Sequence, residues 1–423
     1  MSRNKELAWK QLDNAAKIFP TNSNKYDTKV FRFSCRLKEE IQPAVLQIAL
    51  DKTMHAFPLY NSIIRKGLFW YYFESSTIKP KVKEEKHSPC GPIYDVNVKG
   101  LLFEVTYFKK RINLEIHHAL TDGVGALQFL RTLVLNYLLM VHGEEIKNPS
   151  LSIDYDASLA EREADGFIKY SSNGKGEKAP SNGKAYKFKG ERIDEDFLQV
   201  INGQVSVKEV LKVAHQYQTT LTIYLTALLI QSIGMQMNER EKKRPVVVSV
   251  PVNLRPYFQS ASARNFFSVV LVPYCFGNGK DSLEDIISHL KAFFAKELKT
   301  EKFQARINRL VSLEKNYVTR AVPLFLKGPT LKLAHYFNSK EVTTSFSNIG
   351  RVTMPEELNA YIDGFDVCVS TRKIQVCLCS FGDQLSISFT SPYRGTEVQK
   401  HFFRALTSQG IDVVLSTNLI EVE

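Results

Sequence analysis

The chain has 423 residues, of which 44% are hydrophobic and 24% charged, the balance of an ordinary globular protein. This composition excludes a disordered, a fibrous or a small disulfide-rich protein, and the length predicts two or three domains. The net charge of +12, from 56 Lys and Arg against 44 Asp and Glu, indicates a polyanionic partner. Charge alone leaves coenzyme A, an acidic carrier protein and an anionic membrane open, whereas no nucleic-acid-binding motif is present.

The N-terminus and the cysteines indicate a cytoplasmic protein. The first residues contain no apolar segment of the kind that a secretory signal needs. The longest apolar stretch, Leu127–Val141, is interrupted by Arg131 and Asn136, so we expect no transmembrane segment. The six cysteines are sparse, which favours reduced thiols. Cys377 and Cys379 lack a second Cys or His pair, so we expect no metal site.

Hydrophobic periodicity predicts a mixture of helices and strands in the first half of the chain. The predicted elements are, in order, a helix over Lys10–Pro20, a strand over Thr28–Leu37, a helix over Pro43–Phe57, strands over Phe69–Phe73, Leu101–Phe108 and Ile112–Ile116, and a helix over Val124–Val141. The last helix is almost entirely apolar, so we expect it to be buried on most sides.

A stretch rich in lysine, glycine and serine, Lys169–Lys189, divides the chain. It has the composition of a flexible linker, although a long surface loop within one domain has the same composition. We therefore expect an N-terminal half over residues 1–168, a linker over 169–189 and a C-terminal half over 190–423. The lysines of this stretch would form a mobile cationic strip that steers a polyanionic ligand.

The second half also mixes helices and strands. The predicted elements are, in order, a helix opened by Ser206, a helix over Thr222–Met237, strands over Val246–Val250 and Phe266–Tyr274, helices over Leu283–Leu298 and Ala305–Leu313, strands over Val342–Phe346, Phe365–Ser370, Ile374–Cys379 and Leu385–Phe389, and a helix over Glu397–Gln409. Since both halves combine helices with sheet, the predicted fold class is α+β.

The segment Ile112–Gly125 carries the most specific chemical signal. In a strand with a two-residue period its three isoleucine and leucine side chains share one face, and His118 falls on that same inward face. A neutral imidazole aimed inward at a strand end suits a general base. Asp122, four residues later in a tight turn, would more plausibly brace the loop, most simply through an arginine. A buried histidine pair followed by an aspartate helix cap is the structural alternative.

The string HHALTDG over His117–Gly123 resembles the HHxxxDG motif of the CoA-dependent acyltransferase superfamily, which includes chloramphenicol acetyltransferases and peptide-forming condensation domains. Three further strings are similar to segments of that superfamily. Val250–Pro256 resembles its PVNLRP segment, Arg264–Phe267 its GN-type strand start, and Ser345–Gly350 its SN-x-G crossover segment. The resemblance spans nearly the whole chain and is strongest to bacterial alcohol-acetyltransferase-like proteins.

The resemblance implies two chloramphenicol-acetyltransferase-like αβ sandwich halves around a central channel, with the catalytic histidine midway along it. It implies an acyltransferase that takes an acyl group from acyl-CoA, bound as a co-substrate, to a small-molecule alcohol or amine. A thioester on an acyl carrier protein is the alternative donor. Hydrolysis of the thioester and non-catalytic acyl binding are the alternative activities.

Carried over onto this sequence, the motif makes His118 the general base and places Asp122 beside it in the catalytic string. We expect Asp122 to act structurally, through an ion pair that ties the two halves together next to the site. Arg255, in the PVNLRP-like segment, is the expected partner, and Arg372 is the alternative.

The remaining candidate residues have supporting roles. We expect His117 to pack or to donate a hydrogen bond behind the site, and Gly123 to occupy a turn that demands a backbone without a Cβ. The tetrahedral intermediate of acyl transfer needs a donor for its oxyanion. Ser345, Ser347 and Asn348 lie in the crossover segment; Ser347 is the first choice and Asn348 the second.

Overall fold

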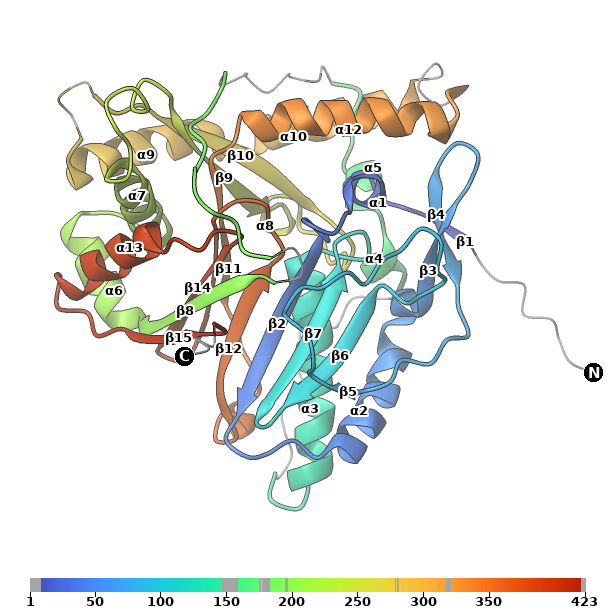
Figure 1. Ribbon diagram of the computed structural model, residues 1–423. Helices are drawn as coiled ribbons and strands as arrows, with labels where there is room; N and C mark the ends of the chain where they lie inside the picture. The colour runs from blue at the N-terminus through green and yellow to red at the C-terminus, as the bar shows by residue number, and fades with distance from the viewer. Residues whose placement is uncertain are drawn as a thin grey trace, which may run out of the picture.

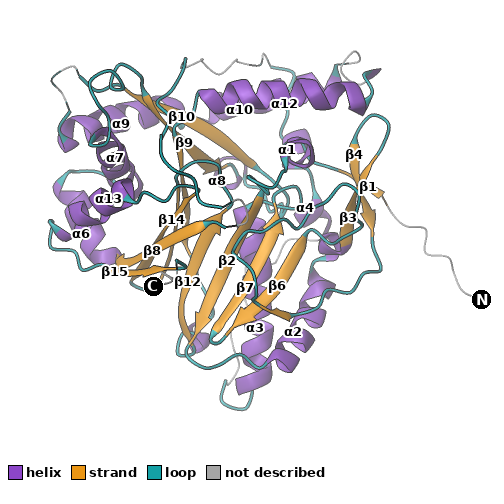
Figure 2. Cartoon of the chain, in the orientation of Figure 1, coloured by secondary structure: helices purple, strands orange, loops and turns teal. Residues whose placement is uncertain are grey.

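The computed structural model describes residues 9–146, 159–174, 176, 183–194, 197–277, 279, 281–316 and 321–419. Residues 175 and 177–182 of the predicted linker lie outside this described part of the chain. Two sheets meet in the middle of the molecule, and helices flank them on the outside (Figures 1 and 2). The predicted α+β class is confirmed.

The first sheet has five strands and belongs mainly to the N-terminal half. In order across the sheet these are β12 (Ile362–Val369), β2 (Val30–Leu37), β7 (Arg111–His117), β6 (Phe103–Phe108) and β5 (Lys83–Glu84). β7 is the central strand and runs antiparallel to both β2 and β6. Its alternate residues Ile112, Leu114 and Ile116 are fully buried in the core.

β12 reaches this sheet from the C-terminal part of the chain. It pairs antiparallel with β2 and places Phe365 opposite Cys35. The two parts of the chain therefore share backbone hydrogen bonds in one sheet, and they cannot separate without breaking that ladder. The division at 168 and 190 stays a prediction.

Two long helices cover one face of this sheet, α2 (Pro43–Ala56) and α3 (Gly123–His142). α3 is long and apolar enough to cross a membrane by length and composition, and it is the one such helix among the described residues. Its inner face packs on α2 and contributes Phe129, Leu133 and Tyr137 to the core. The expected burial of this helix is therefore observed on the sheet side, whereas its C-terminal end is more exposed.

The predicted helix over Lys10–Pro20 is wrong. The chain there forms a short strand, β1 (Trp9–Gln11), followed by a 3-10 turn, η1 (Ala16–Ile18), and one helical turn, α1 (Phe19–Asn22). Asp13 sits between them and accepts a hydrogen bond from the Ala16 backbone at 2.7 Å, which starts the 3-10 turn. Pro20 lies in the first turn of α1, where a missing backbone N–H costs nothing, so it does not end a helix.

β1 joins a separate three-stranded sheet at the edge of the molecule. Its order is β1, β4 (Tyr71–Ser75) and β3 (Ser62–Lys66), and β3 and β4 form an antiparallel hairpin. The hairpin turn is Gly67–Trp70, which includes two residues of the predicted aromatic strand. Figure 1 shows this hairpin beneath one end of the helix α12 (Leu324–Lys340).

The second sheet has seven strands. In order across it these are β10 (Phe267–Tyr274), β9 (Val246–Asn253), β11 (Thr344–Arg351), β13 (Gln375–Phe381), β14 (Gln384–Ser391), β8 (Gln199–Ser206) and β15 (Val414–Thr417). The helices of this part are α6 (Val207–Gln216), α7 (Leu221–Gly234), α9 (Leu283–Glu297), α10 (Thr300–Lys315), α12 and α13 (Glu397–Thr407). Three further helices are only one turn or little more, α4 (Leu159–Glu163), α5 (Gly166–Lys169) and α8 (Arg255–Phe258).

β8 and α12 are the two longest of the elements that escaped the sequence analysis. β8 contains Asn202-Gly203, a pair that normally marks a turn. Gly203 stands in the strand because a Cβ there would lie 2.2 Å from the Phe403 ring of α13. α12 contains Gly328-Pro329, which reads as a helix break, yet the helix continues through both residues.

The described end of the predicted linker is tied to the fold. The Lys187 ammonium donates hydrogen bonds to the carbonyls of Ser339 and Val342, at 2.5 and 2.6 Å. Lys189 pairs with Glu241 at 2.6 Å. These two lysines therefore do not belong to a mobile strip.

Candidate active site

The turn after β7 is built by Asp122, which caps α3. Its Oδ1 accepts hydrogen bonds from the backbone N–H groups of Val124 and Gly125, both at 3.2 Å, and so satisfies two donors at the helix N-terminus. Its Oδ2 accepts a third, at 2.9 Å, from the Phe266 backbone just before β10. One carboxylate thus joins the start of α3 to a loop some 140 residues later in the chain.

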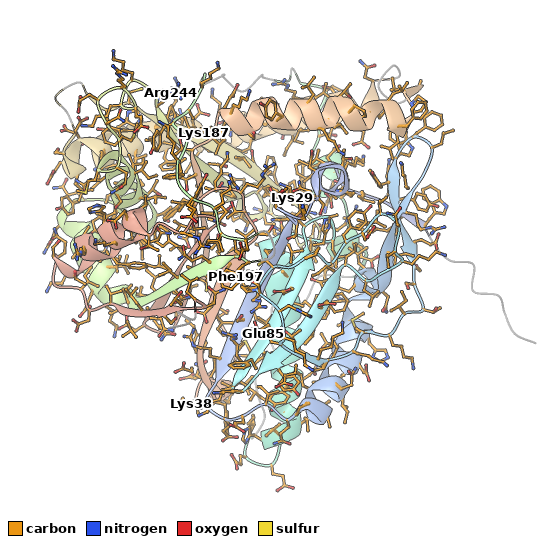
Figure 3. The ribbon with its side chains drawn as sticks, in the orientation of Figure 1. Lys29, Lys38, Glu85, Lys187, Phe197 and Arg244 are labelled. Atoms are coloured by element: carbon orange, nitrogen blue, oxygen red, sulfur yellow. The ribbon has the colours of Figure 1, made fainter. Side chains whose placement is uncertain are left out.

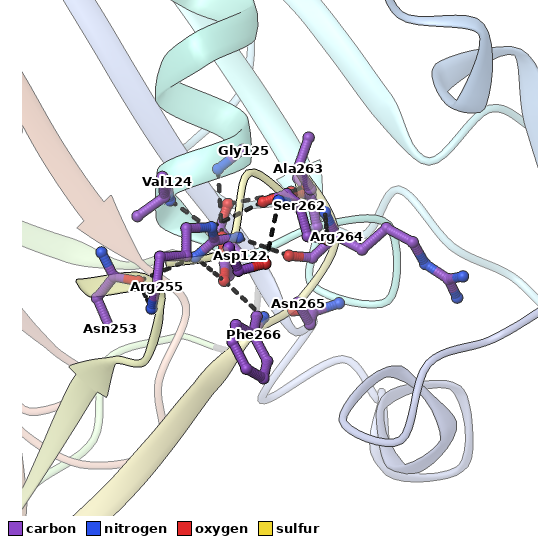
Figure 4. A network of polar contacts seen from close by, with 12 residues as sticks. Asp122, Val124, Gly125, Asn253, Arg255, Ser262, Ala263, Arg264, Asn265 and Phe266 are labelled. Atoms are coloured by element: carbon purple, nitrogen blue, oxygen red, sulfur yellow. Dashed lines mark hydrogen bonds and ion pairs between the residues drawn. The ribbon is translucent and has the colours of Figure 1, made fainter. Parts of the chain in front are cut away.

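Arg255 holds the same carboxylate through two side-chain hydrogen bonds (Figure 4). Its Nη1 donates to Oδ2 at 2.9 Å and its Nη2 to Oδ1 at 3.0 Å, and both side chains are buried. The contact expected between these two residues is present. Arg372, the alternative partner, instead stacks on Tyr26 with its guanidinium 5.4 Å from the ring centre.

The guanidinium of Arg255 has further partners, which fix its plane. Nε donates to the Ser262 carbonyl and Nη2 to the Arg264 carbonyl, each at 2.7 Å, and Nη1 donates to the Asn253 side chain at 3.2 Å. A buried ion pair is stable only when such extra bonds offset the loss of hydration. The network therefore positions the loop between α8 and β10 against the start of α3.

His118 lies beside this network, packed between aromatic rings. The Phe19 ring of α1 stacks on the imidazole at 4.8 Å between centroids, and Phe31 of β2 lies at 4.6 Å. The Phe267 ring of β10 lies 6.2 Å away. The inward orientation expected from the strand phase is thus observed, since Phe31 belongs to the same core as the apolar face of β7.

The surroundings of His118 keep its imidazole neutral. The pKa of His118 is lowered to about 4. Burial is the largest cause and the Lys29 ammonium acts in the same direction, while the Asp122 carboxylate and the Asn265 side chain partly offset them. At neutral pH the ring therefore has a free lone pair. The backbone N–H of His118 donates to the Lys29 carbonyl at 2.8 Å, which fixes the end of the strand.

Asn265 is a polar neighbour of His118 that contacts its backbone. Nδ1 is buried and makes no hydrogen bond of good geometry within the described part of the chain, and the same holds for the side-chain oxygen of Asn265. The Asn265 amide nitrogen donates to the His118 carbonyl at 3.2 Å and to Asp13 at 3.3 Å. Asn265 stands in the GN-type string, but nothing in the sequence marked it as a neighbour of the histidine.

His117 faces the other way. It is fully buried, and its Nδ1 accepts a hydrogen bond from the Ala119 backbone at 3.3 Å. Tyr94 lies 5.1 Å from its ring. Burial lowers the pKa of His117 to about 3, and the neighbouring His118 contributes in the same direction. Its geometry is that of a packed, neutral histidine behind the strand end.

Two glycines at the start of α3, Gly123 of the motif and Gly125 just after it, are required for close packing. Gly123 is the first residue of α3, directly after the turn, and its φ is not positive. A Cβ on Gly123 would lie 3.0 Å from the side chain of Ile349 in β11. Gly125 is more restrictive, since a Cβ there would lie 2.1 Å from both the Ala263 carbonyl and the Thr121 hydroxyl.

No protein-family model and no curated protein matches this sequence. Solved structures do match over nearly the whole chain. F. graminearum TRI101, complexed with coenzyme A and T-2 mycotoxin, is 10% identical with a TM-score of 0.63, covering 96% of this chain and 99% of that one. The polyketide synthase associated protein 5 from Mycobacterium tuberculosis is 12% identical with a TM-score of 0.59, covering 94% and 97%.

The first condensation domain of the CDA synthetase is 13% identical with a TM-score of 0.59, covering 96% of this chain and 97% of that domain. TRI101 and the condensation domain are members of the CoA-dependent acyltransferase superfamily. The chain has the chloramphenicol-acetyltransferase-like fold.

In this acyltransferase fold the crossover segment lies in β11, against the start of α3. Ile349 makes the contact with Gly123, and Ser347 stands two residues before it. The Asn348 side chain already makes two hydrogen bonds. Its amide nitrogen donates to the Thr222 hydroxyl at 2.9 Å, and its oxygen accepts from the Gly350 backbone at 2.8 Å. The role of Ser347 as oxyanion donor stays a prediction.

A cavity of about 1060 Å³ opens on the face of the first sheet that α2 and α3 leave uncovered. Arg32, Glu85 and Phe197 are among its lining residues; Figure 3 labels the last two over this face. His118 does not line it, but Thr28 does, one residue before the Lys29 carbonyl that holds the His118 backbone. A channel with the histidine midway stays a prediction.

The described residues contain no group of three or more His, Cys, Asp or Glu that could hold a metal ion. The buried charges near the cavity are paired instead. Arg32 donates to Glu115 at 2.7 Å and also pairs with Glu85, which accepts from Arg111 at 2.6 Å. This network stabilises the middle of the sheet without leaving an uncompensated charge.

Proposed function

We propose that the protein is an acyltransferase that moves an acyl group from a thioester donor, acyl-CoA, to a hydroxyl or amine acceptor. The observation that carries the proposal is His118: a neutral imidazole held between aromatic rings at a strand end, next to a capped helix start. The acyltransferase fold supports it, because the superfamily members of this fold perform that reaction class. TRI101 is complexed with coenzyme A in one of the similar structures.

In the proposed reaction His118 Nε2 accepts the proton from the acceptor O–H or N–H as that atom attacks the thioester carbonyl. The carbon–sulfur bond of the tetrahedral intermediate then breaks, and the protonated imidazole returns the proton to the leaving thiolate. Both substrates are bound together, since no nucleophilic Ser or Cys belongs to the motif that would form an acyl-enzyme.

Asn265 is the residue that we assign to hold the imidazole. Its amide nitrogen already donates to Asp13 and to the His118 carbonyl, which leaves its buried oxygen as an acceptor. The buried Nδ1–H of His118 is the donor that lacks a partner, and the Asn265 side chain acts on the His118 pKa in the direction of an acceptor. A hydrogen bond between the two would place the lone pair on Nε2.

Asp122 and Arg255 act as a brace in this proposal. Their ion pair holds the β10 side of the site against α3, and the carboxylate raises the basicity of His118 from a distance. Ser347 is the proposed donor to the oxyanion, because it lies on the β11 segment that touches the start of α3.

A donor and acceptor screen with mass-spectrometric detection of the product tests the proposal. Thiol release that requires an alcohol or amine supports acyl transfer, whereas release without an acceptor indicates hydrolysis. Turnover of an acyl carrier protein thioester but not of acyl-CoA would assign the donor to the alternative that condensation domains suggest. Binding of acyl-CoA with no turnover of any acceptor would contradict the enzymatic proposal.

A further inference from the structure

The helix α12 presents large apolar side chains to solvent. Phe325 is 63% exposed, Leu326 52%, Leu333 56% and Tyr336 54%, and Leu68 in the neighbouring hairpin turn is 66% exposed. We call these five residues the α12 surface. Monomeric proteins expose such side chains singly, and a gathered set marks a site of interaction.

The hairpin and the helix form one continuous surface. The Leu324 backbone N–H donates to the Leu68 carbonyl at 2.7 Å, and the Lys327 ammonium donates to the Phe69 carbonyl at 3.3 Å. The same ammonium lies 4.1 Å from the centre of the Trp70 ring. The turn between β3 and β4 is therefore anchored to the first turn of α12, and the hairpin lies beside that end of the helix (Figure 1).

The charged residues of α12 itself have one sign. The 17 residues of α12 contain Lys327, Lys332 and Lys340 and no Asp or Glu. The hairpin adds Lys66 and Arg65; the latter pairs across the hairpin with Glu74 at 3.3 Å. Exposed apolar side chains beside lysines suit the surface of an anionic bilayer, because the lipid phosphates attract the lysines.

We propose that the α12 surface docks the protein on an anionic lipid membrane. Two copies of the chain placed face to face through this surface would bring their lysines together, whereas lipid phosphates would neutralise them. The apolar side chains would enter the boundary between headgroups and acyl chains. This surface goes beyond the proposed acyl transfer, and docking requires no turnover.

The position of α12 links the docking surface to the site. α12 packs against α1 (Phe19–Asn22), and Phe19 stacks on His118 at 4.8 Å. A bilayer under α12 would therefore lie one short helix away from the imidazole. An acceptor or donor with a long apolar chain would reach the site from the membrane without crossing bulk water.

Co-sedimentation with lipid vesicles tests the proposal on the intact protein. We expect binding to phosphatidylcholine vesicles that contain about one third phosphatidylglycerol, and little binding to phosphatidylcholine alone. At about 1 M salt, where the Debye length falls to about 3 Å, binding should weaken strongly. The double variant Phe325→Ser/Leu326→Ser should lose about tenfold or more of its affinity, because both side chains leave the interface.

A matched control uses two exposed apolar residues far from α12 in the chain. Val414 and Leu415 of β15 are 68% and 55% exposed, and Val414→Ser/Leu415→Ser should bind vesicles as the unmodified protein does. Lys332→Glu should weaken binding to anionic vesicles. Circular dichroism establishes that each variant is folded.

Three outcomes would overturn the proposal: no binding of the unmodified protein to anionic vesicles, binding of the Phe325→Ser/Leu326→Ser variant at full strength, and equal binding to neutral and anionic vesicles. Light scattering tests whether a second copy of the chain, and not a membrane, covers the α12 surface. A dimer that this double variant converts to a monomer, without vesicle binding by the unmodified protein, would assign the surface to a second copy of the chain.

Discussion

Arg255 and Asp122 meet through two hydrogen bonds of 2.9 and 3.0 Å, although 133 residues separate them in the chain. Both are buried, so removal of one charge leaves the other without compensation. The pair joins the cap of α3 to the segment that follows β9, and it stands between the two sheets that frame the site.

We expect Asp122→Asn to lower stability and activity together. Removing one partner of a buried ion pair costs about 3–5 kcal/mol, which urea unfolding would measure. The control is Glu104→Gln, which removes the exposed pair with Lys83 and should cost about 1 kcal/mol or less. If activity fell with an unchanged melting temperature, Asp122 would be a catalytic acid and not a brace.

His118→Ala should abolish turnover and leave the protein folded, because loss of a general base costs about 10²–10⁴ in rate. The matched control is His117→Ala. That side chain is fully buried behind the strand, so the variant should lose stability and keep more of its kcat. A His118→Ala enzyme with more than about a tenth of the original kcat would show that the base is another group.

Asn265→Leu should lower kcat more than it changes either KM, because the imidazole loses the acceptor that orients it. The side chain raises the pKa of His118, so its loss should move the acid limb of the pH–rate profile to lower pH. A merely structural effect would reduce the amount of folded enzyme and leave that limb in place. The pH dependence of kcat/KM separates the two.

The two histidines should make the fold sensitive to acid. Both have folded-state pKa values below the ordinary 6.5, about 3 for His117 and about 4 for His118, so the unfolded chain binds more protons there. The contribution of the two neutral histidines to the free energy of unfolding is therefore complete above about pH 6.5. It is lost as the pH falls toward their folded-state pKa values. Asp13 acts in the opposite direction, since burial raises its pKa to about 6. As the pH falls, the folded state binds a proton at Asp13 before the unfolded chain does, and this favours the folded state.

The effect of one histidine is isolated by His117→Gln. The free energy of unfolding of this variant should fall less steeply between about pH 6.5 and 4 than that of the unmodified protein. Denaturant titrations at several pH values measure the difference. Parallel pH profiles for the two proteins would show that His117 is not held neutral by the fold.

The sequence predicted those parts of the site that depend only on residues close together in the chain. The two-residue period of β7 placed His118 on the apolar face, and the string around Asp122 marked the turn before an apolar helix. Residue chemistry also matched Asp122 with an arginine, because a buried carboxylate needs a bidentate partner. These features depend on spacings of a few residues, which can be seen in the sequence without knowledge of the tertiary contacts.

Only the tertiary structure decided the neighbours that come from distant segments. Phe19 covers His118 because Asp13 turns the N-terminal segment there, where the periodicity predicted a straight helix. Asn265 reaches the His118 backbone carbonyl because the Arg255 network folds its loop back onto α3. β12 enters the first sheet, and Gly123 meets Ile349, through packing between segments more than 200 residues apart. Periodicity records which face of an element is apolar, but the choice among apolar partners depends on shape and on buried hydrogen bonds that form only when the chain is folded.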